Sequence, residues 1–408
     1  MAHEHDALSG IDRGAQGRRL RGVGLGVLVL AVVGLVALWP RGDAPELGAV
    51  PYRYVDATVL EVRDQTCPGV EAAGDVPCRE IEAEVTSGPD DGAVVAFVVL
   101  ETQVEVPALA EGQGIVLRDA FATQLEEFRY GFHDVQRTTP LVLLAVAFAA
   151  VVVVFGRWQG VRALLGLALG VTVLAVFLVP ALLRDGPAVP LALVAGLAVT
   201  GVALYLAHGF TAGTTIALLG TLASVVLVTL LALVAVRAAG ISGLGGEDAR
   251  ILSVTASALD LRGLLVAGIV VGVLGSLDDV TVTQVATVAA LRRADPTLSP
   301  RRLYAEAIQV GRDHVAASVN TLVLAYAGAS LPLLLVFAQG GQPVARVVTG
   351  ELVAVEVIRM LVGSIGLVAS VPLTTALAAV VLAGGPAGEA DDVPVEAGPR
   401  WEDFGPPA

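Results

Sequence analysis

The chain has 408 residues, of which 55% are hydrophobic and only 16% are charged. Soluble globular proteins carry a charged share of about 25%, so this composition, with its repeated long apolar stretches, indicates a helical membrane protein with several spans. All 25 basic residues are arginine, and the lack of lysine excludes phosphate-loop NTPases and Schiff-base enzymes. The net charge is −14, and the sequence has no basic patch. Nucleic-acid binding is therefore not expected.

The first apolar stretch covers residues 22–39 and follows three arginines. It ends in Trp39, not in the small residues at which a signal peptide is cleaved. We therefore expect an uncleaved transmembrane anchor, 22–39, behind a cytoplasmic N-terminal segment, 1–21.

Residues 43–138 form the only sizeable polar block, with 19 acidic residues and six arginines. Apolar and polar residues alternate over 54–62 and 79–85, and candidate strands follow at 93–100 and 114–117. Four or five short strands predict a small extracytoplasmic β-rich domain, either a barrel or a sandwich. Its acidic charge is expected to keep the domain solvated, with cation attraction as the alternative.

Cys67 and Cys78 are the only cysteines, and both lie in this polar block. An extracytoplasmic location permits a disulfide, and closing so short a loop would stabilise the fold by about 2–3 kcal/mol. We expect a structural disulfide. Two free thiols or a metal clip are the alternatives, although the spacing matches no standard zinc motif.

Seven further apolar runs follow, each long enough to span a hydrocarbon core of about 30 Å. The runs are 139–156, 161–183, 188–207, 212–236, 263–290, 315–338 and 358–383. With the anchor they predict an all-α bundle of about eight transmembrane helices. Residues 139–383 then form a seven-helix domain, followed by an acidic disordered tail, 384–408.

The placement of the arginines favours both termini in the cytoplasm, and we expect the chain in the cytoplasmic membrane. Arg157 and Arg162, and then five arginines between residues 292 and 312, fall in or beside predicted inside loops. Two amphipathic segments, 247–262 and 343–357, are expected near the outer interface.

The run 263–290 carries two adjacent carboxylates, Asp278 and Asp279. A charged side chain in hydrocarbon costs roughly 2.5–3.5 kcal/mol on the insertion scale, so such residues normally face a bundle interior or a water-filled path. Two adjacent carboxylates repel each other, and burial favours the neutral form, so at least one is expected to bind a proton reversibly. A wetted position near the cytoplasmic end of the helix is the alternative.

Polar residues near the aspartates complete a predicted proton or ion relay of Asp279, Asp278, Thr283 and Asn320. Thr283 lies on the same stripe of the helix as Asp279, and Asn320 of the next run is placed to hydrogen-bond an aspartate. Ordinary polar contacts between helices are the alternative for Asn320. For His314, near the inner surface, solvation is expected, with a proton relay as the alternative.

Glu356 and Arg359 stand three residues apart before the last apolar run. This spacing predicts an ion pair on one helix face near the outer boundary. A gate or the outer end of a proton path is the alternative.

The sequence contains no nucleophile elbow, no zinc-protease signature and no paired-cysteine metal site. An intramembrane aspartyl protease would need aspartates on two helices, and besides the run 263–290 no predicted helix core offers one. We therefore expect neither an enzyme nor a bound metal or cofactor.

Several motifs, in this order and spacing, resemble those of the YibE/F-like membrane protein family. The resemblance covers about residues 50–383 and implies a multispanning bacterial envelope protein. In the family pattern the carboxylate corresponds to Asp279, whereas the position of Asp278 is usually apolar. The motifs are Leu259-Asp260-Leu261-Arg262-Gly263, Gly275-Ser276-Leu277-Asp278-Asp279-Val280, Asn320-Thr321-Leu322, Ala325-Tyr326-Ala327-Gly328, Ser330-Leu331-Pro332-Leu333, Gly363-Ser364-Ile365-Gly366-Leu367 and Val371-Pro372-Leu373-Thr374.

The order of elements is also similar, more loosely, to the SecD/SecF and RND group. That similarity rests on an anchor helix, an outer domain, an acidic helix and an arginine-rich turn. It implies intramembrane acidic groups that couple proton flow to work outside the membrane, and it is an analogy at the level of fold.

The leading hypothesis is a proton- or ion-coupled membrane transporter or export factor. Asp279 would bind the ion, and residues 43–138 would engage a substrate or an envelope protein partner. The competing hypothesis is a non-transporting membrane scaffold that presents its outer domain to envelope machinery. Beyond the lipid bilayer, the sequence identifies neither a partner nor an oligomeric state.

Overall fold

The computed structural model describes residues 15–42, 52–67, 76–100, 108–121, 129–255, 259–339, 341 and 343–383. The chain divides into two compact units. A β-rich unit covers residues 46–155, and a helical unit comprises residues 1–45 and 156–408. Most of the predicted N-terminal segment and the predicted acidic tail lie outside the described residues.

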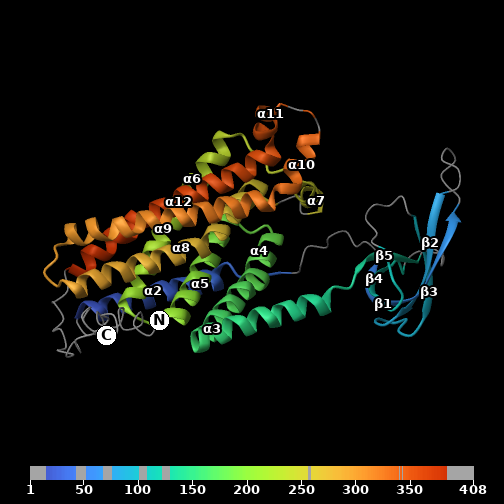
Figure 1. Cartoon of the computed structure of the whole chain (residues 1–408), viewed down its shortest axis with the longest axis horizontal. Helices are drawn as coiled ribbons and strands as arrows, with labels where there is room; N and C mark the ends of the chain where they lie inside the picture. Colours follow the sequence, from blue (N-terminus) through green and yellow to red (C-terminus); the bar gives the residue numbers. More distant parts are fainter. Residues whose placement is uncertain are drawn as a thin grey trace, which may run out of the picture. The chain divides into compact units, whose positions relative to one another are not determined.

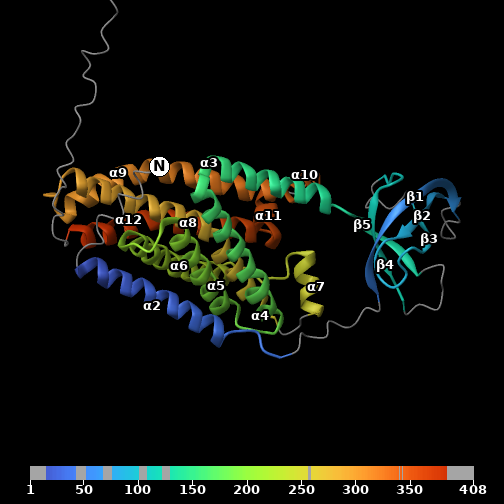
Figure 2. The same cartoon turned by 90° about the horizontal axis from the view of Figure 1, so that it is seen from below.

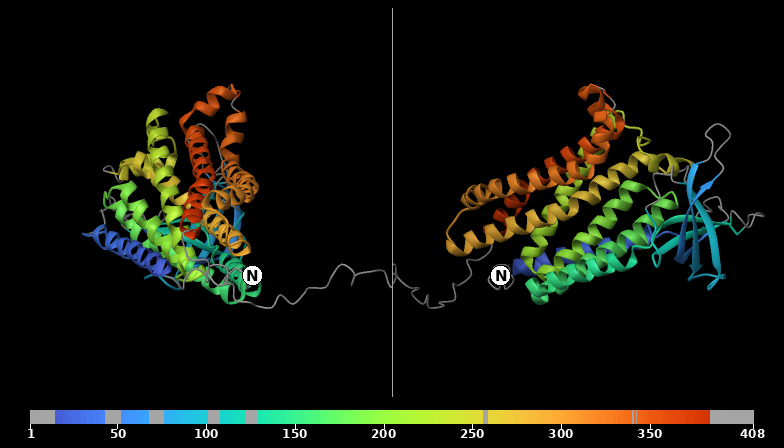
Figure 3. Two further views of the ribbon diagram at one scale, coloured as in Figure 1. Left: turned by 90° about the vertical axis from the view of Figure 1, so that its left-hand side faces the viewer. Right: turned by 45° about the vertical axis from the view of Figure 1, so that its right-hand side comes forward.

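The helical unit is organised around three long helices that contact one another (Figure 1). These are α6, α8 and α12. Helix α9 packs on α8 and α12, α5 packs on α6 and α8, and α2 contacts α5 and α6 (Figures 2 and 3). The bounds are α2 (Ala15–Ala37), α5 (Ala188–His208), α6 (Ala212–Ala238), α8 (Leu261–Ala294), α9 (Pro300–Ala329) and α12 (Glu351–Ala383).

Shorter elements connect these helices. They are the π-helical turn η3 (Leu174–Leu178), α4 (Val179–Leu183), α7 (Glu247–Thr255), α10 (Leu331–Gln339) and α11 (Val344–Thr349). The predicted amphipathic segments contain α7 and α11.

Six helical segments in the described part of the chain are long and apolar enough to cross a membrane. Helices α9 and α10 together form a seventh candidate, although the pair is bent by 56°. The segment Thr138–Leu183, which begins with α3 (Thr138–Val173), has 46 residues. A straight helix of that length would measure about 69 Å, more than twice the hydrocarbon thickness. Its backbone breaks at Arg157, with φ 51° and ψ −132°, between two predicted spans. The total of eight spans stays a prediction.

Helix α9 begins 15 residues before the span predicted at 315–338. Its start is set locally, because Ser299 caps the helix and accepts a hydrogen bond of 3.4 Å from the backbone N–H of Arg302. Pro300 occupies the first helical position, where its missing N–H costs nothing. Arginines expected in a loop, such as Arg301 and Arg312, therefore lie on the helix.

The β-rich unit contains one five-stranded antiparallel sheet in the order β3-β2-β1-β4-β5. The edge strands β3 and β5 approach each other, so the sheet curls into a half-barrel. The strands predicted at 54–62, 79–85, 93–100 and 114–117 are confirmed. The strands are β1 (Arg53–Cys67), β2 (Val76–Val85), β3 (Val94–Leu100), β4 (Gly114–Asp119) and β5 (Tyr130–Val135).

Alternate residues of each strand form the core of the half-barrel, as the period of two requires. Val55, Ala57 and Val59 of β1 are buried, and so are Ile115 and Leu117 of β4. The pairing of β1 with β2 shifts between Val59 and Glu61. Such a bulge increases the local twist, and it lies just beyond the segment Arg53–Thr58 that pairs with β4.

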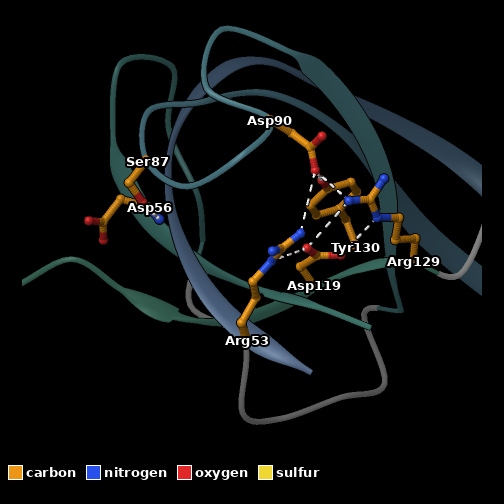
Figure 4. A network of polar contacts seen from close by, with 7 residues as sticks. All are labelled: Arg53, Asp56, Ser87, Asp90, Asp119, Arg129 and Tyr130. Atoms are coloured by element: carbon orange, nitrogen blue, oxygen red, sulfur yellow. Dashed lines mark hydrogen bonds and ion pairs between the residues drawn. The ribbon is translucent and has the colours of Figure 1, made fainter. Parts of the chain in front are cut away.

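A network of charged side chains ties together the open edge of the half-barrel (Figure 4). Asp119 is fully buried and accepts hydrogen bonds from Arg53 Nε at 2.7 Å and Arg129 Nε at 2.8 Å. Asp90, on the β2–β3 turn, accepts a hydrogen bond of 2.7 Å from the Tyr130 hydroxyl and pairs with Arg129. Side chains of β1, β4 and β5 are thereby joined to the β2–β3 turn.

Burial alone would raise the pKa of Asp119, but the hydrogen bonds from Arg129 and Arg53 outweigh it and hold this pKa below its usual range. Burial also raises the pKa of Tyr130 to about 12, helped by its hydrogen bond to Asp90. Asp119 is therefore a carboxylate, and Tyr130 a neutral donor, at ordinary pH.

Replacing Asp119 by Asn is expected to destabilise the half-barrel by about 3 kcal/mol, because it leaves Arg53 and Arg129 without their buried counter-charge. Hydrogen exchange of the full chain in detergent measures this. Protection of β1, β4 and β5 should fall about 100-fold, while α6 and α8 keep theirs. Unchanged protection of the strands would contradict the assigned role.

The same network predicts a pH dependence with a definite sign. Because the folded pKa of Asp119 is lowered, its stabilising contribution is complete above the ordinary value of 3.8 and is lost as the pH falls through the folded pKa. Exchange protection of β1 and β4, corrected for intrinsic rates, should fall steeply below about pH 4. Asp119→Asn should flatten this part of the profile.

Candidate functional site

The two adjacent aspartates of α8 point to different surroundings, because neighbouring helical residues are about 100° apart. Asp278 is half-buried and faces α5 and α6. The side chain of Asp279 is 73% exposed in the helical unit. The sequence alone does not show which of the two faces inward, since both neighbours of the pair along the chain are apolar.

Asp278 meets threonine hydroxyls from two other helices. Thr200 of α5 and Thr221 of α6 lie beside its carboxyl group, and both threonines are almost completely buried. Asp278 Oδ1 and Thr200 Oγ1 are buried without a hydrogen-bond partner among the described residues. Thr221 and Thr281 share a hydrogen bond of 2.8 Å between their hydroxyl oxygens. The surroundings of Asp278 thus contain oxygen atoms with unused hydrogen-bonding capacity.

A cavity of about 220 Å³ joins this carboxyl group to one end of the bundle. His208, the last residue of α5, lies in its wall, so the cavity extends from the α5–α6 turn to the aspartates. Its volume is enough for several water molecules. The wall consists of Ala163 and Gly166 of α3, Ala203, Leu204, Ala207 and His208 of α5, and Asp278, Asp279 and Val282 of α8.

The other predicted relay residues lie nearer the surface of the helical unit. Asp279 Oδ2 is 3.7 Å from Nε2 of His314 on α9. The Thr283 hydroxyl donates to the backbone oxygen of Asp279 at 2.8 Å, not to its carboxyl group. Asn320 is exposed on α9. The structure therefore brings Asp278 alone of this predicted set into the core, and the relay itself stays a prediction.

A second buried polar cluster joins α8 and α12. Gln284 is fully buried and accepts a hydrogen bond of 2.8 Å from the Thr375 hydroxyl. Gln284 Nε2 and the neighbouring Thr374 Oγ1 have no hydrogen-bond partner among the described residues. Single threonines in apolar runs are common, so sequence reasoning missed Thr200, Thr221 and Thr375. Only the packing of different helices shows that they gather around Asp278 and Gln284.

The predicted pair Glu356–Arg359 has the expected geometry. Arg359 Nη1 donates to Glu356 Oε1 at 2.8 Å and to Oε2 at 2.9 Å. Both side chains are about one-quarter exposed. A gating role for this pair stays a prediction. Glu351, which the sequence did not single out as a site, accepts from the backbone N–H groups of Ser242 and Gly243 and fixes the α6–α7 loop to α12.

Cys78 is disulfide-bonded, and the chain has one other cysteine, Cys67. The side chain of Cys67 lies outside the described residues. The predicted pairing of Cys67 with Cys78 therefore stays a prediction.

Several apolar helices, some of them packed around a half-buried carboxyl group, define a helical multispan membrane protein. The family described as YibE/F-like protein matches residues 144–384. This match covers more than half of the chain, so the chain belongs to the YibE/F-like family, as its motifs predicted. The β half-barrel precedes the matched region. No curated protein and no solved structure matches the chain.

Replacing Gly311 by Ala is expected to destabilise the helical unit by about 1–3 kcal/mol through overpacking. A Cβ atom at this position would lie 2.5 Å from Val371 Cγ1 and 2.8 Å from Gln284 Nε2. Chemical unfolding in detergent measures the loss. Gly26→Ala on α2 is the matched control, because its Cβ would meet open space and alanine favours a helix. Equal stability of the two variants would contradict tight packing at Gln284.

Proposed function

We propose that this chain is a proton- or cation-coupled membrane transporter or export factor, and that Asp278 is its coupling carboxyl group. The observation that carries the proposal is the buried Oδ1 of Asp278, which lies among threonine hydroxyls and has no hydrogen-bond partner within the described part of the chain. A structural polar contact between helices would satisfy its hydrogen bonds within the bundle. A group that binds and releases an ion needs free capacity in one of its states.

The depth of Asp278 supports the same role. Thr200 lies eight residues before the end of α5, and Thr221 lies nine residues after the start of α6. At 1.5 Å per residue, both are about 12–14 Å from the α5–α6 turn. The 21 residues of α5 measure about 31 Å, close to the hydrocarbon thickness. Asp278 therefore lies within the span, where a charge is costly and a neutral acid is not.

The surroundings of Asp278 can stabilise its carboxyl group whether it is ionised, protonated or bound to a cation. A threonine hydroxyl donates one hydrogen bond and accepts others, so Thr200 and Thr221 can stabilise a carboxylate, a carboxylic acid or a bound alkali cation. The change between these states alters the attraction between α8 and its neighbours α5 and α6. Such a change is what coupling ion movement to helix movement requires.

Ion access would run through the cavity that ends at His208. In the orientation that the arginines favour, the α5–α6 turn lies on the cytoplasmic side of the inner membrane, with both termini in the cytoplasm. The β half-barrel would then lie outside, where it would engage a substrate or an envelope protein partner.

Replacing Asp278 by Asn should abolish ion coupling, because the amide cannot take up and release a proton or compensate a cation. The measurement is the charge displaced on a solid-supported membrane after a jump in pH or in Na⁺ concentration. Asp279→Asn is the matched control, since it makes the same chemical change at the exposed neighbour. We expect displacement from the wild type and from Asp279→Asn, and none from Asp278→Asn.

Two results would contradict the proposal. Charge displacement that survives in Asp278→Asn would remove Asp278 from the coupling step. A folded wild type that displaces no charge after either jump would favour the scaffold hypothesis, in which the aspartates serve helix packing.

A further inference from the structure

The cavity beside Asp278 is larger and more apolar than a path for a proton or an alkali cation requires. Its volume of about 220 Å³ far exceeds the roughly 10–15 Å³ that a cavity needs to hold one water molecule. Of the nine residues that the described part of the chain places in its wall, six are glycine, alanine, leucine or valine. A bare ion gains nothing from such groups, because it needs oxygen atoms around it. The wall suits a ligand with an apolar part.

The polar groups of the cavity stand toward its two ends. Asp278 lies beside Thr200 of α5, and His208 ends the same helix eight residues further on. At 1.5 Å per residue, these two levels are about 12 Å apart. Between them α5 contributes two alanines and a leucine to the wall. The cavity thus has a carboxyl group at its deep end and an apolar surface leading to it.

Small residues keep the space between α3 and α5 open. A Cβ at Gly166 would lie 3.5 Å from the Ala203 Cα atom, and a Cβ at Gly170 would lie 3.2 Å from Val199 Cγ1. The two helices therefore run in opposite directions and touch at these levels. One turn nearer the α5–α6 turn, the wall residues of both helices are alanines, whose methyl groups leave the space between the helices unfilled.

The carboxyl group of Asp278 is available to a ligand. Asp278 is half-buried and lines the cavity, and its Oδ1 has no hydrogen-bond partner among the residues that the structure describes. The other carboxyl group of the wall belongs to Asp279, whose Oδ2 lies 3.7 Å from Nε2 of His314 on α9. His314 is not a wall residue. The deep end of the cavity is therefore complementary to one positive charge.

Other classes of ligand fit this wall poorly. An anion would meet two carboxyl groups and, among the described wall residues, no arginine. The hydroxyl groups of a sugar would face alkyl side chains, and a buried hydroxyl group without a hydrogen bond is costly. A neutral hydrocarbon would leave the carboxyl group of Asp278 without a partner. A ligand that joins one cationic group to a short alkyl chain meets both parts of the wall.

We propose that the cavity binds a small primary alkylammonium cation, with the ammonium group at Asp278 and the alkyl chain along the apolar wall. An ammonium group donates three hydrogen bonds and accepts none, which matches the acceptor oxygens of a carboxylate. A primary amine is charged at ordinary pH, as the lysine side chain with its pKa of about 10.4 shows. This inference rests on the proposed function, because the organic cation would be the substrate that a coupled proton or Na⁺ displaces from Asp278.

A series of alkylammonium ions tests the site in the unaltered protein. The full chain in lipid nanodiscs is titrated calorimetrically with methyl-, ethyl-, propyl- and n-butylammonium. Each added methylene group should raise the affinity about fourfold, and the whole series about 60-fold, because each leaves water for the apolar wall. Asp278→Asn should lose this binding, and its signal also measures any partition of the ions into lipid.

A matched pair of variants tests the apolar wall. Ala203→Leu adds three carbon atoms inside the cavity and should weaken n-butylammonium binding about tenfold. It should leave methylammonium binding unchanged, because the smaller ion occupies only the Asp278 end. Ala223→Leu makes the same change at an exposed position of α6 and should alter neither affinity. The unfolding transition in detergent shows that both variants are folded.

The outcomes separate this inference from the proposed function. Affinities that do not rise with chain length, or that survive in Asp278→Asn, would overturn the alkylammonium site. If the wild type still displaces charge after a jump in pH or in Na⁺ concentration, that failure leaves the coupling role of Asp278 intact. Chain-length-dependent binding through Asp278 without any charge displacement would support the site and contradict ion coupling.

Discussion

The helical unit depends on the cost of placing ionisable groups among apolar helices. Two carboxylates stand side by side on α8, and helical geometry sends them in different directions. Asp278 turns toward α5 and α6, where hydroxyl groups surround it. Asp279 turns outward to His314 on α9. A shift of one position along α8 thus separates a carboxyl group inside the bundle from one on its surface.

Close packing around α8 is achieved with small residues. A Cβ at Gly363 of α12 would lie 2.9 Å from Val273, and one at Gly196 of α5 would lie 3.3 Å from Leu274. Glycine at these positions lets α5 and α12 approach α8 closely, as is usual where lipid and protein are equally apolar. The same closeness brings hydroxyl groups from three helices together and makes a polar interior possible in an apolar chain.

In the β half-barrel, charged side chains connect parts of the sheet that strand pairing leaves apart. Its sheet is not closed by a ring of strand pairing, since β3 and β5 are the two ends of the sheet order. Instead, Asp90 on the β2–β3 turn contacts Arg129 and Tyr130 at the start of β5 and so connects the two ends of the sheet. In both units, therefore, carboxylates mark the positions where regular backbone structure alone does not complete the fold.

Much of the architecture follows directly from the sequence. Hydrophobic period and length alone predicted most of the apolar helices and four of the strands, because these signals depend on neighbours along the chain. The start of α9 at Pro300 lay in a stretch of mixed polarity, where a Ser-Pro helix start outweighs hydropathy. The strand β5 was not predicted on its own, since its six residues include both glycine and charge.

The candidate site was likewise predicted only in part from the sequence. The sequence by itself determined that two carboxylates lie in an apolar helix, because that statement needs only local composition. It favoured Asp279 as the ion-binding residue, through its shared stripe with Thr283 and through the family pattern. Only the tertiary structure decided that Asp278 faces Thr200 and Thr221 while Asp279 faces outward, because these contacts join residues 57 to 78 positions apart in the chain. The direction in which a helix face points is set by the helices that pack on it, and periodicity within one helix does not contain that information.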